Sequence, residues 1–340
     1  MRPKHCRGCL AFPAWCARKS TLAALSAKPL WLGIARRIWV AFFALAAIAF
    51  MAYLMREQHA MIAAIHPQRP WLLLSAAIVH GVFWLVAIAF WRYTVHVTTH
   101  RTQSMMESLR QLALVAVGKY IPGKISGFLA RGAALKESQT TTRDILAATF
   151  VEQWTMLMSA SFVSGVLLLL IRPNRPLTLL GVTAVTIAIF GNHFFRIGNL
   201  AFKHLLAKFS GSRDAGPSKP ISDRQYLALL LTHSLMWILI GTVLASMCFA
   251  FSPQPFSLEL YEALVLANTV GIVVGFVALF APGGLGVREA VTTAVLLPYL
   301  PLEQAVILSI AFRAWTSGVD ILIAIGLVWQ TTWTAGRPRT

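Results

Sequence analysis

Long apolar runs separated by short basic segments divide this sequence, and that pattern limits the fold more than any other feature. A transmembrane helix needs about 20 consecutive apolar residues. Six runs come near or exceed this length: residues 38–55, 71–91, 145–171, 177–195, 226–251 and a last run that ends at Trp329. Because backbone polar groups inside a bilayer must be satisfied within the segment, such runs form helices. We therefore expect an all-α, polytopic membrane bundle with about six full spans.

The composition supports this class. The chain is 57% hydrophobic and 12% charged, whereas about a quarter of the residues of a soluble domain are charged. This leaves no room for a sizeable soluble domain. We expect a basic cytoplasmic arm over residues 1–37, a transmembrane domain over 38–330 and a short cytoplasmic tail over 331–340.

Basic residues are unevenly distributed between the apolar runs. The net charge is +18, from 30 Lys and Arg against 12 Asp and Glu, and most of the basic residues fall in segments 1–37, 92–144 and 196–224. The positive-inside rule places such segments, and with them both termini, in the cytoplasm. Topology thus accounts for a charge that would suggest nucleic-acid binding in a soluble protein, and we expect no nucleic-acid partner.

Two segments do not have the pattern of a simple span. Residues 105–135 are broken by "GKYIPGK", and residues 261–300 are broken by "APGGLG". Neither half of either segment is long enough to cross a bilayer comfortably, and broken helices at membrane depth are buried in protein or line a cavity. We expect two re-entrant hairpins, the first entering from the cytoplasm and the second from outside. Opposite orientation is typical of the inverted repeats of secondary transporters.

Proline and glycine define both breaks, at Pro122, Gly123, Pro282, Gly283, Gly284 and Gly286. Proline ends a helix, and glycine permits backbone conformations that other residues avoid. Gly118, Gly123 and Lys124 also have the G-x-x-x-x-G-K spacing of a phosphate-binding loop. That motif requires Ser or Thr after the lysine, and this chain has Ile125 there. A nucleotide site is therefore not expected.

Basic side chains accompany both breaks. Lys119, Lys124 and Arg131 surround the first, and Arg288 lies in the first turn after the second. Helix N-termini and basic side chains attract anions, so we expect these four residues to bind a lipid phosphate. A plainer interpretation of the first break is a broken helix whose lysines lie at the cytoplasmic interface.

Four further charged residues fall within apolar segments: Glu152, Glu289, Arg313 and Asp320. Charges at membrane depth are costly and usually functional. Asp320 lies seven residues after Arg313, so both occupy one helix face. In one interpretation these residues form structural ion pairs, with Glu152 and Arg313 bound to each other or to Arg131 and Arg288. In the other they line a polar cavity that carries a lipid headgroup while the acyl chains stay in the bilayer.

Other polar and aromatic residues of the apolar runs have ordinary explanations. His80 and His233 are lone histidines, which more often form a hydrogen bond between helices than bind a ligand. Trp71, Trp91 and Trp329 lie at span ends, as in an interfacial aromatic belt. Gly271-x-x-x-Gly275 permits close helix contact.

Motifs for catalysis or metal binding are lacking. His5, Cys6, Cys9 and Cys16 match no standard zinc spacing, and no nucleophile–base pair is evident. We expect no catalytic residue, metal or cofactor, and no ATP-driven step. Glu152 and Asp320 are the candidate proton carriers if transport is coupled to an ion.

A family resemblance rests on "GKYIPGKISGFLAR", the following "FVEQ" and the distant "PGGLGVREA". Together they resemble the lysylphosphatidylglycerol synthase transmembrane region, a flippase-like family, over about residues 38–329. The resemblance implies a multi-pass protein of a bacterial plasma (inner) membrane. In the namesake enzymes this region moves aminoacylated phosphatidylglycerol between leaflets, and a soluble domain makes that lipid. Only "QTTWTAGRPRT" follows Trp329, so the synthase chemistry is not expected here.

These observations favour a lipid translocase whose partners are anionic or aminoacylated membrane lipids. One alternative is a membrane subunit or enzyme of lipid modification that works with a separate soluble transferase. A second alternative is a secondary transporter of small solutes. The sequence leaves the oligomeric state open.

Overall fold

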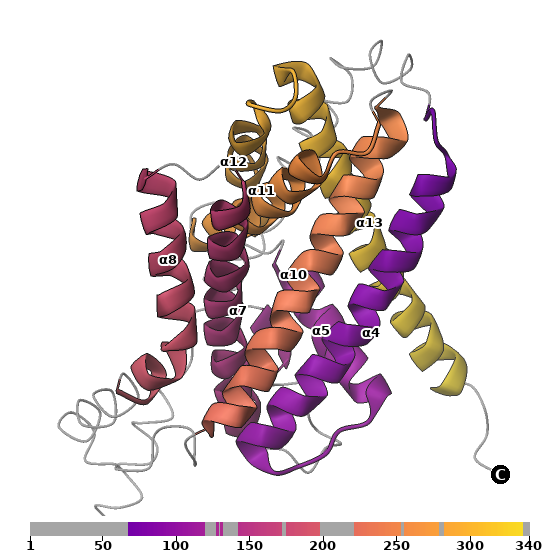
Figure 1. The fold of residues 1–340 in the computed structure, drawn as a ribbon. Coiled ribbons are helices and arrows are strands. Elements are labelled where there is room, and N and C mark those ends of the chain that lie inside the picture. The colour runs from indigo at the N-terminus through magenta and orange to yellow at the C-terminus, as the bar shows by residue number, and fades with distance from the viewer. Residues whose placement is uncertain are drawn as a thin grey trace, which may run out of the picture.

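Helices account for all the regular secondary structure in the described part of the chain (Figure 1). The computed structural model describes residues 67–119, 127–128, 130–131, 142–171, 175–197, 221–252, 255–278 and 282–335. No strand occurs in these ranges, which confirms the all-α class. The N-terminal arm, the expected span 38–55, Pro122, Gly123 and Lys124 lie outside the described residues.

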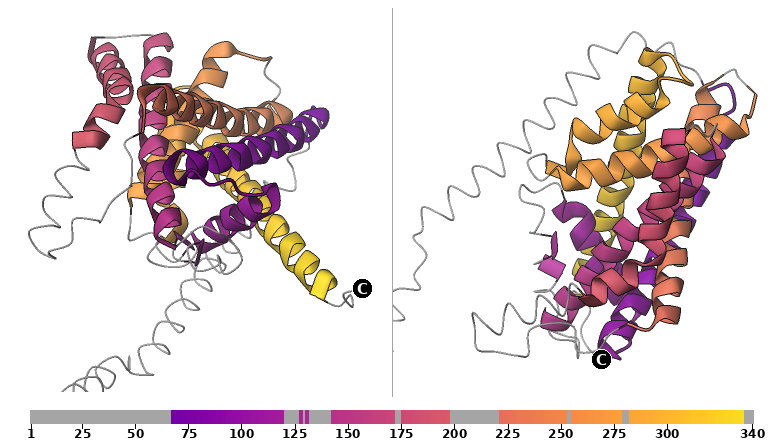
Figure 2. Two further views of the ribbon diagram at one scale, coloured as in Figure 1. Left: turned by 90° about the horizontal axis from the view of Figure 1, so that it is seen from below. Right: turned by 60° about the vertical axis from the view of Figure 1, so that its left-hand side comes forward.

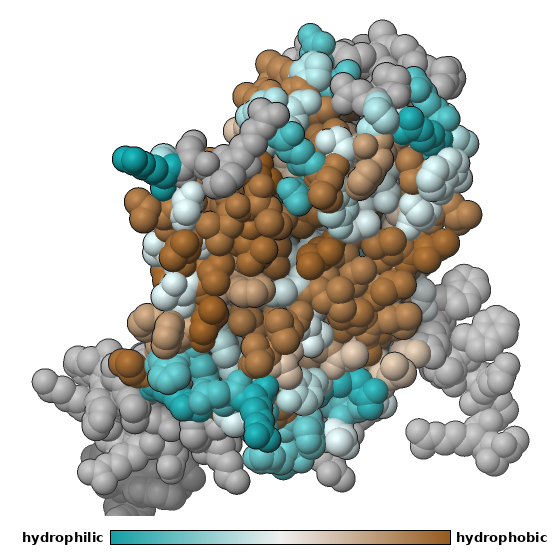
Figure 3. All heavy atoms as spheres, in the orientation of Figure 1, coloured by the Kyte–Doolittle hydropathy of each residue, from teal (hydrophilic) through white to brown (hydrophobic). Residues whose placement is uncertain are grey.

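Five of the helices are long and apolar enough to cross a membrane: α4 (Trp71–Thr99), α7 (Thr142–Leu170), α10 (Asp223–Phe251), α11 (Leu258–Val277) and α13 (Leu302–Ala335). A sixth candidate is α8 (Arg175–Ile189) together with the short helix Gly191–Ile197, bent by 56°. The expected single span over 177–195 is thus broken near Phe190. On the face drawn in Figure 3, apolar residues cover the middle of the bundle and polar residues gather at both ends. The chain is a multi-pass membrane protein.

Contacts at the helix ends show how the long helices alternate in direction. The N–H of Gln68, just before α4, donates to the carbonyl of Ala250 at the end of α10, at 2.9 Å. At the opposite end, Arg196 pairs with Asp223 of the first turn of α10, at 3.2 Å. α7 and α8 pack closely because Gly165 and Gly181 face each other, and a Cβ on Gly165 would lie 2.8 Å from the Gly181 carbonyl oxygen.

The core of the bundle lies along α10, which α4, α7 and α11 surround. Gly241 allows α11 to pack closely against α10, since a Cβ there would lie 2.9 Å from the Cα of Val265. Trp237 donates its indole N–H to Ser159 of α7, at 3.0 Å. Lipid tails are as apolar as these side chains, so close packing and hydrogen bonds between helices, rather than transfer from water, stabilise such a core.

The two broken segments give three shorter elements: α5 (Met105–Gly118), the 3-10 turn η1 (Pro282–Gly284) and α12 (Val287–Leu296). Ser104 caps the start of α5, because its hydroxyl accepts the N–H of Glu107 at 3.1 Å. It lies in the lower half of Figure 1, whereas α11 and α12 lie in the upper half, where α13 begins. The two segments therefore occupy opposite ends of the bundle.

In each broken segment, a close contact between two glycines brings the part before the break against the part after it. A Cβ on Gly118 would overlap the backbone of Gly127, and a Cβ on Gly284 would lie 2.9 Å from the Cα of Gly275. The two partners are nine residues apart in both segments. This shared spacing supports the expected relationship between the segments more directly than the Pro-Gly dipeptides do.

α11 corrects one expectation. It begins at Leu258, after its cap Ser257, and runs for 20 residues, so it is long enough to cross a membrane. The expectation that neither half of this segment could do so is wrong for this half, because it left out the first residues of the helix. α12 folds back beside α11 (Figure 2). As expected, Gly271 permits this contact: a Cβ on it would overlap the Thr292 hydroxyl of α12.

Candidate functional site

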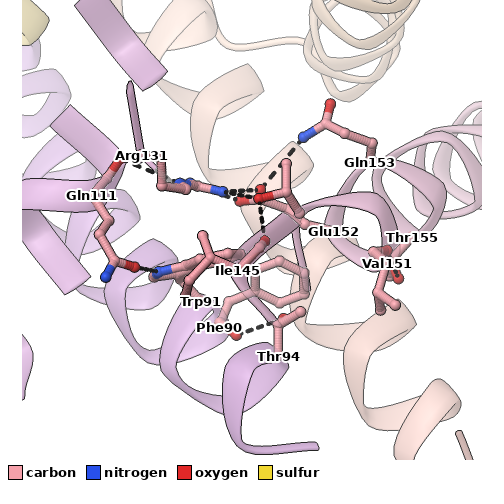
Figure 4. Close-up of polar contacts among 11 residues, drawn as sticks. Phe90, Trp91, Thr94, Gln111, Arg131, Ile145, Val151, Glu152, Gln153 and Thr155 are labelled. Carbon is pink, nitrogen blue, oxygen red and sulfur yellow. Dashed lines mark hydrogen bonds and ion pairs between the residues drawn. The ribbon is translucent and has the colours of Figure 1, made fainter. Parts of the chain in front are cut away.

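An enclosed ion pair joins the second half of the first broken segment to α7 (Figure 4). The guanidinium of Arg131 lies 2.6 Å from one carboxylate oxygen of Glu152 and 3.4 Å from the other. It also donates to the Thr149 hydroxyl and to the backbone carbonyl of Gln111, both at 3.3 Å. Arg131 is 0% exposed. Such a paired, hydrogen-bonded arrangement satisfies a charge that would otherwise be very costly to bury.

Trp91 of α4 completes this group. Its ring lies under the Arg131 guanidinium, 3.7 Å from the ring centroid, and its N–H donates to the Gln111 side chain at 2.6 Å. A cation over an indole face is attracted by the ring quadrupole, most strongly away from water. Trp91 is fully buried, so the expectation that it belongs to an interfacial belt is wrong. Trp71 is 64% exposed, as that belt requires, and the Trp329 side chain lies outside the described residues.

A second ion pair joins α12 to α13. Arg313 of α13 lies 3.3 Å from one carboxylate oxygen of Glu289. The other oxygen accepts the N–H of Gly286 at 2.7 Å, so Glu289 also caps the helix that it belongs to. Gly283, Gly284 and Gly286 have φ of 58°, 73° and 79°, values that favour glycine. These three residues position the N-terminus of α12, and with it Glu289.

A cavity of about 410 Å³ lies against this second pair. Glu289 and Arg313 are in its wall, with Thr293 and Ser309. Its remaining lining is apolar or glycine: Leu285, Gly286, Ala290, Ala294, Leu297, Val306 and Ile310. The volume lies within the range of small-molecule sites, about 300–1,000 Å³. The cavity thus combines a localised ionic group with an apolar wall.

Arg288 lies elsewhere, although it precedes Glu289 in the sequence. Its guanidinium donates to the Asn268 side chain of α11 at 3.4 Å and lies 5.3 Å from the ring centroid of Phe312. It is not part of the cavity lining. Successive helix residues point in different directions, so Glu289 lines the cavity and Arg288 does not.

A third ion pair connects the first broken segment to α13. Lys119, immediately after α5, lies 2.5 Å from a carboxylate oxygen of Asp320. Asp320 is buried, whereas the lysine side chain is 39% exposed. One face of α13 therefore carries Arg313 toward the second broken segment and Asp320 toward the first.

Residues 29–324 match the family model described as the lysylphosphatidylglycerol synthase TM region. The chain belongs to this family. Membership confirms the resemblance and connects the protein with lipid modification or translocation. No curated protein matches the chain.

The matched region of this lysylphosphatidylglycerol synthase family member contains the cavity and the Arg131–Glu152, Glu289–Arg313 and Lys119–Asp320 ion pairs. Of the partners considered from the sequence, Glu152 binds Arg131, but Arg313 binds neither Glu152 nor Arg288. Arg313 instead binds Glu289, and Asp320 binds Lys119. The ionic residues thus form separate pairs along the bundle.

The sequence did not mark several residues of the site as functional. Trp91, Gln111 and Thr149 enclose Arg131, and Thr293 and Ser309 line the cavity. All occur in apolar helices where an aromatic, amide or hydroxyl residue is common. His80 accepts a hydrogen bond from Trp315 of α13 at 3.1 Å, as expected for a histidine between helices. Within the described ranges, no cluster of three His, Cys, Asp or Glu side chains could hold a metal.

Proposed function

We propose that this protein is a lipid translocase that moves a phosphate-bearing phospholipid or aminoacyl-phospholipid between the leaflets of a bacterial plasma (inner) membrane. The observation that carries the proposal is the cavity between α12 and α13, whose mainly apolar wall contains one ion pair and two hydroxyl residues, Thr293 and Ser309. A lipid likewise combines a charged headgroup with apolar chains. Membership of a lipid-related family supports the same assignment.

The charges of the cavity wall favour a particular kind of headgroup. Arg313 can receive a phosphate, because guanidinium matches phosphate geometry. Glu289 can receive an ammonium group. A headgroup with both charges would replace the pair without leaving net charge in a poorly solvated site, whereas a purely anionic headgroup would add one. Aminoacylated phospholipids, which carry an amine and a phosphate, meet this condition.

The position of the cavity fits alternating access. It lies toward the end of the bundle where α13 begins, and the distribution of basic segments assigns that end to the outside. The first broken segment, which contains α5, lies toward the opposite end of the bundle (Figure 1), and the basic segments favour that end as the cytoplasmic one. Two oppositely placed segments that contact one long helix could expose a shared site to each side in turn. In this scheme Arg131 holds its segment against α7, and Lys119, paired with Asp320, holds the end of α5 against α13.

A membrane subunit of a lipid-modifying system is the second candidate. The family description names a synthase, so the same cavity could hold a lipid that a separate soluble transferase modifies. This candidate predicts that the purified chain moves no lipid without its partner. A transporter of small solutes has less support, because an apolar wall is poorly suited to a hydrated solute.

Reconstitution in liposomes tests the proposal. The full chain is placed in vesicles of phosphatidylglycerol and phosphatidylethanolamine that contain a fluorescent alanyl-phosphatidylglycerol. A membrane-impermeant quencher then follows transfer between leaflets. We expect transfer in the presence of the protein and a loss of at least about tenfold in rate for Arg313→Gln, since a buried charged contact is removed. Arg101→Gln, an exposed site outside the cavity, is the matched control. Equal transfer in protein-free vesicles would refute the proposal.

A further inference from the structure

Two polar contacts join α13 to α4 and α5, at residues that follow the cavity-lining part of α13. Trp315 donates its indole N–H to Nδ1 of buried His80 in α4, at 3.1 Å. Lys119, at the end of α5, binds the Asp320 carboxylate at 2.5 Å. Trp315 and Asp320 are five residues apart on α13. These contacts connect three elements that are distant in the sequence.

The first contact depends on the protonation state of His80. A histidine nitrogen accepts a hydrogen bond only when it carries no proton. The Trp315 bond therefore selects neutral His80 with its proton on Nε2. A proton added to Nδ1 would point at the N–H of Trp315, and this contact would be lost.

The second contact has the same dependence. Lys119 is held by the ionised carboxylate of Asp320. A proton on this carboxylate removes its charge, and the strong, charge-assisted part of the interaction goes with it. Both contacts therefore exist in the deprotonated state and weaken on protonation.

The charges near His80 belong to residues of the same two contacts. Among the described residues, the charged groups that act on His80 are Asp320 of α13 and Lys119 of α5. The neighbouring helices α7 and α10 carry Glu152 and His233, but these have other contacts. Glu152 is bound to Arg131, and the His233 ring packs 4.6 Å from that of Phe90.

A proton on His80 alone would be attracted by the ionised Asp320 carboxylate and repelled by Lys119. When Asp320 is protonated as well, this attraction is lost and the repulsion between His80 and Lys119 remains. Protonation of both groups therefore favours separation of α13 from α4 and α5.

We propose that His80, Trp315, Lys119 and Asp320 form a proton-operated latch that couples lipid movement to proton uptake. When the latch closes, α13 is held against α4 and α5. When His80 Nδ1 and the Asp320 carboxylate each take up a proton, both contacts open, and the protons leave before the latch closes again. Arg313 of the cavity wall lies two helical turns before Asp320 on the same face, so movement of α13 changes the cavity directly. This inference rests on the proposed translocase function.

A distance measurement tests the latch without relying on transport. Spin labels are placed at Leu85→Cys in α4 and Leu322→Cys in α13, both exposed on the bundle. The four native cysteines are replaced by alanine in the full chain. In lipid nanodiscs we expect the distance distribution to shift toward longer values on acidification from about pH 8 to about pH 4, a range that covers the ordinary titration of both histidine and carboxylate groups. An unchanged distribution would overturn the latch.

Transport measured over the same pH range tests the coupling. We expect the rate in the liposome assay to rise at least about fivefold on acidification, as for loss of contacts of this kind. His80→Gln combined with Asp320→Asn removes both titrating groups and should give a rate that does not change with pH. His233→Gln is the matched control, since it removes another buried membrane histidine, and it should keep the wild-type pH response.

The outcomes separate the latch from the translocase. Lipid transfer that is flat across pH, or a double variant that keeps the full pH response, would overturn the coupling while leaving the translocase in place. A pH-dependent distance with no lipid transfer at any pH would support the latch and refute the translocase. If the double variant fails to fold, Trp315→Phe removes one contact but keeps both titrating groups. It should raise the rate at about pH 8 toward the acidic value, and an unchanged rate would overturn the proposal.

Discussion

Arg131 and Glu152 form an ion pair at 2.6 Å that is closed off on one side by the ring of Trp91. In this pair the broken segment supplies the cation and the following long helix supplies the anion. Glu289 and Arg313 form the corresponding pair in the second half of the chain with the charges reversed. The two halves therefore share the position of an ion pair but not its sign, and only the second pair lies in the wall of the cavity.

Removal of one partner from the enclosed pair should strongly destabilise the protein. Glu152→Gln leaves Arg131 buried without a counter-charge, and we expect a loss of about 3–5 kcal/mol. Thermal unfolding of the purified protein in detergent measures this change. Glu303→Gln, at an exposed position at the start of α13, is the control and should change stability little.

Replacement of both partners distinguishes a structural role from a direct role in transport. Arg131→Met with Glu152→Leu removes both charges together, and paired apolar replacements of this kind are often neutral or stabilising. We expect stability near that of the wild type and lipid transfer to be retained. A stable double variant with no transfer would instead indicate that Arg131 binds the lipid phosphate, as the sequence alone suggested.

Trp91 should be essential to the same cluster. Trp91→Leu removes the ring beneath Arg131 and the donor to Gln111, so we expect a loss of about 3 kcal/mol or more, as for other large buried side chains. Trp71→Leu is a matched control, because Trp71 is mainly exposed. Equal effects of the two substitutions on thermal unfolding would contradict the enclosed arrangement.

Gly284 should tolerate no side chain. Its φ is 73°, and a Cβ would lie 2.9 Å from the Cα of Gly275. We expect Gly284→Ala to cost about 1–3 kcal/mol from backbone strain alone, with displacement of α12 and loss of lipid transfer. Gly326→Ala adds the same methyl group to α13 where no atom lies within 4 Å, and it should leave transfer unchanged. A fully active Gly284→Ala variant would show that the position of α12 is not critical.

The two arginines nearest the second break should differ in their effects on transport. Arg313→Lys keeps the charge but loses the planar fork of the guanidinium, so we expect partial activity in the liposome assay. Arg288→Gln removes a contact with Asn268 outside the cavity, and its rate should stay within about threefold of the wild type. A larger loss for Arg288→Gln than for Arg313→Lys would place the headgroup on the α11 side of α12 instead.

The sequence alone was enough to predict the membrane class and some of the places where helices break. Runs such as 71–91 and 226–251 have few alternatives to a spanning helix, since each peptide group in a bilayer needs a partner within the segment. Glycine and proline likewise marked the break before α12, because few other residues adopt its backbone angles. The partner of each charge was left to the tertiary structure. Lys119 and Asp320 are 201 residues apart. Trp91, which the sequence suggested for an interfacial belt, instead packs against the buried Arg131. In a chain where almost any apolar side chain can face either lipid or a neighbouring helix, periodicity does not say which face is buried. Close packing between particular helices makes that choice, and it thereby decides which charges meet.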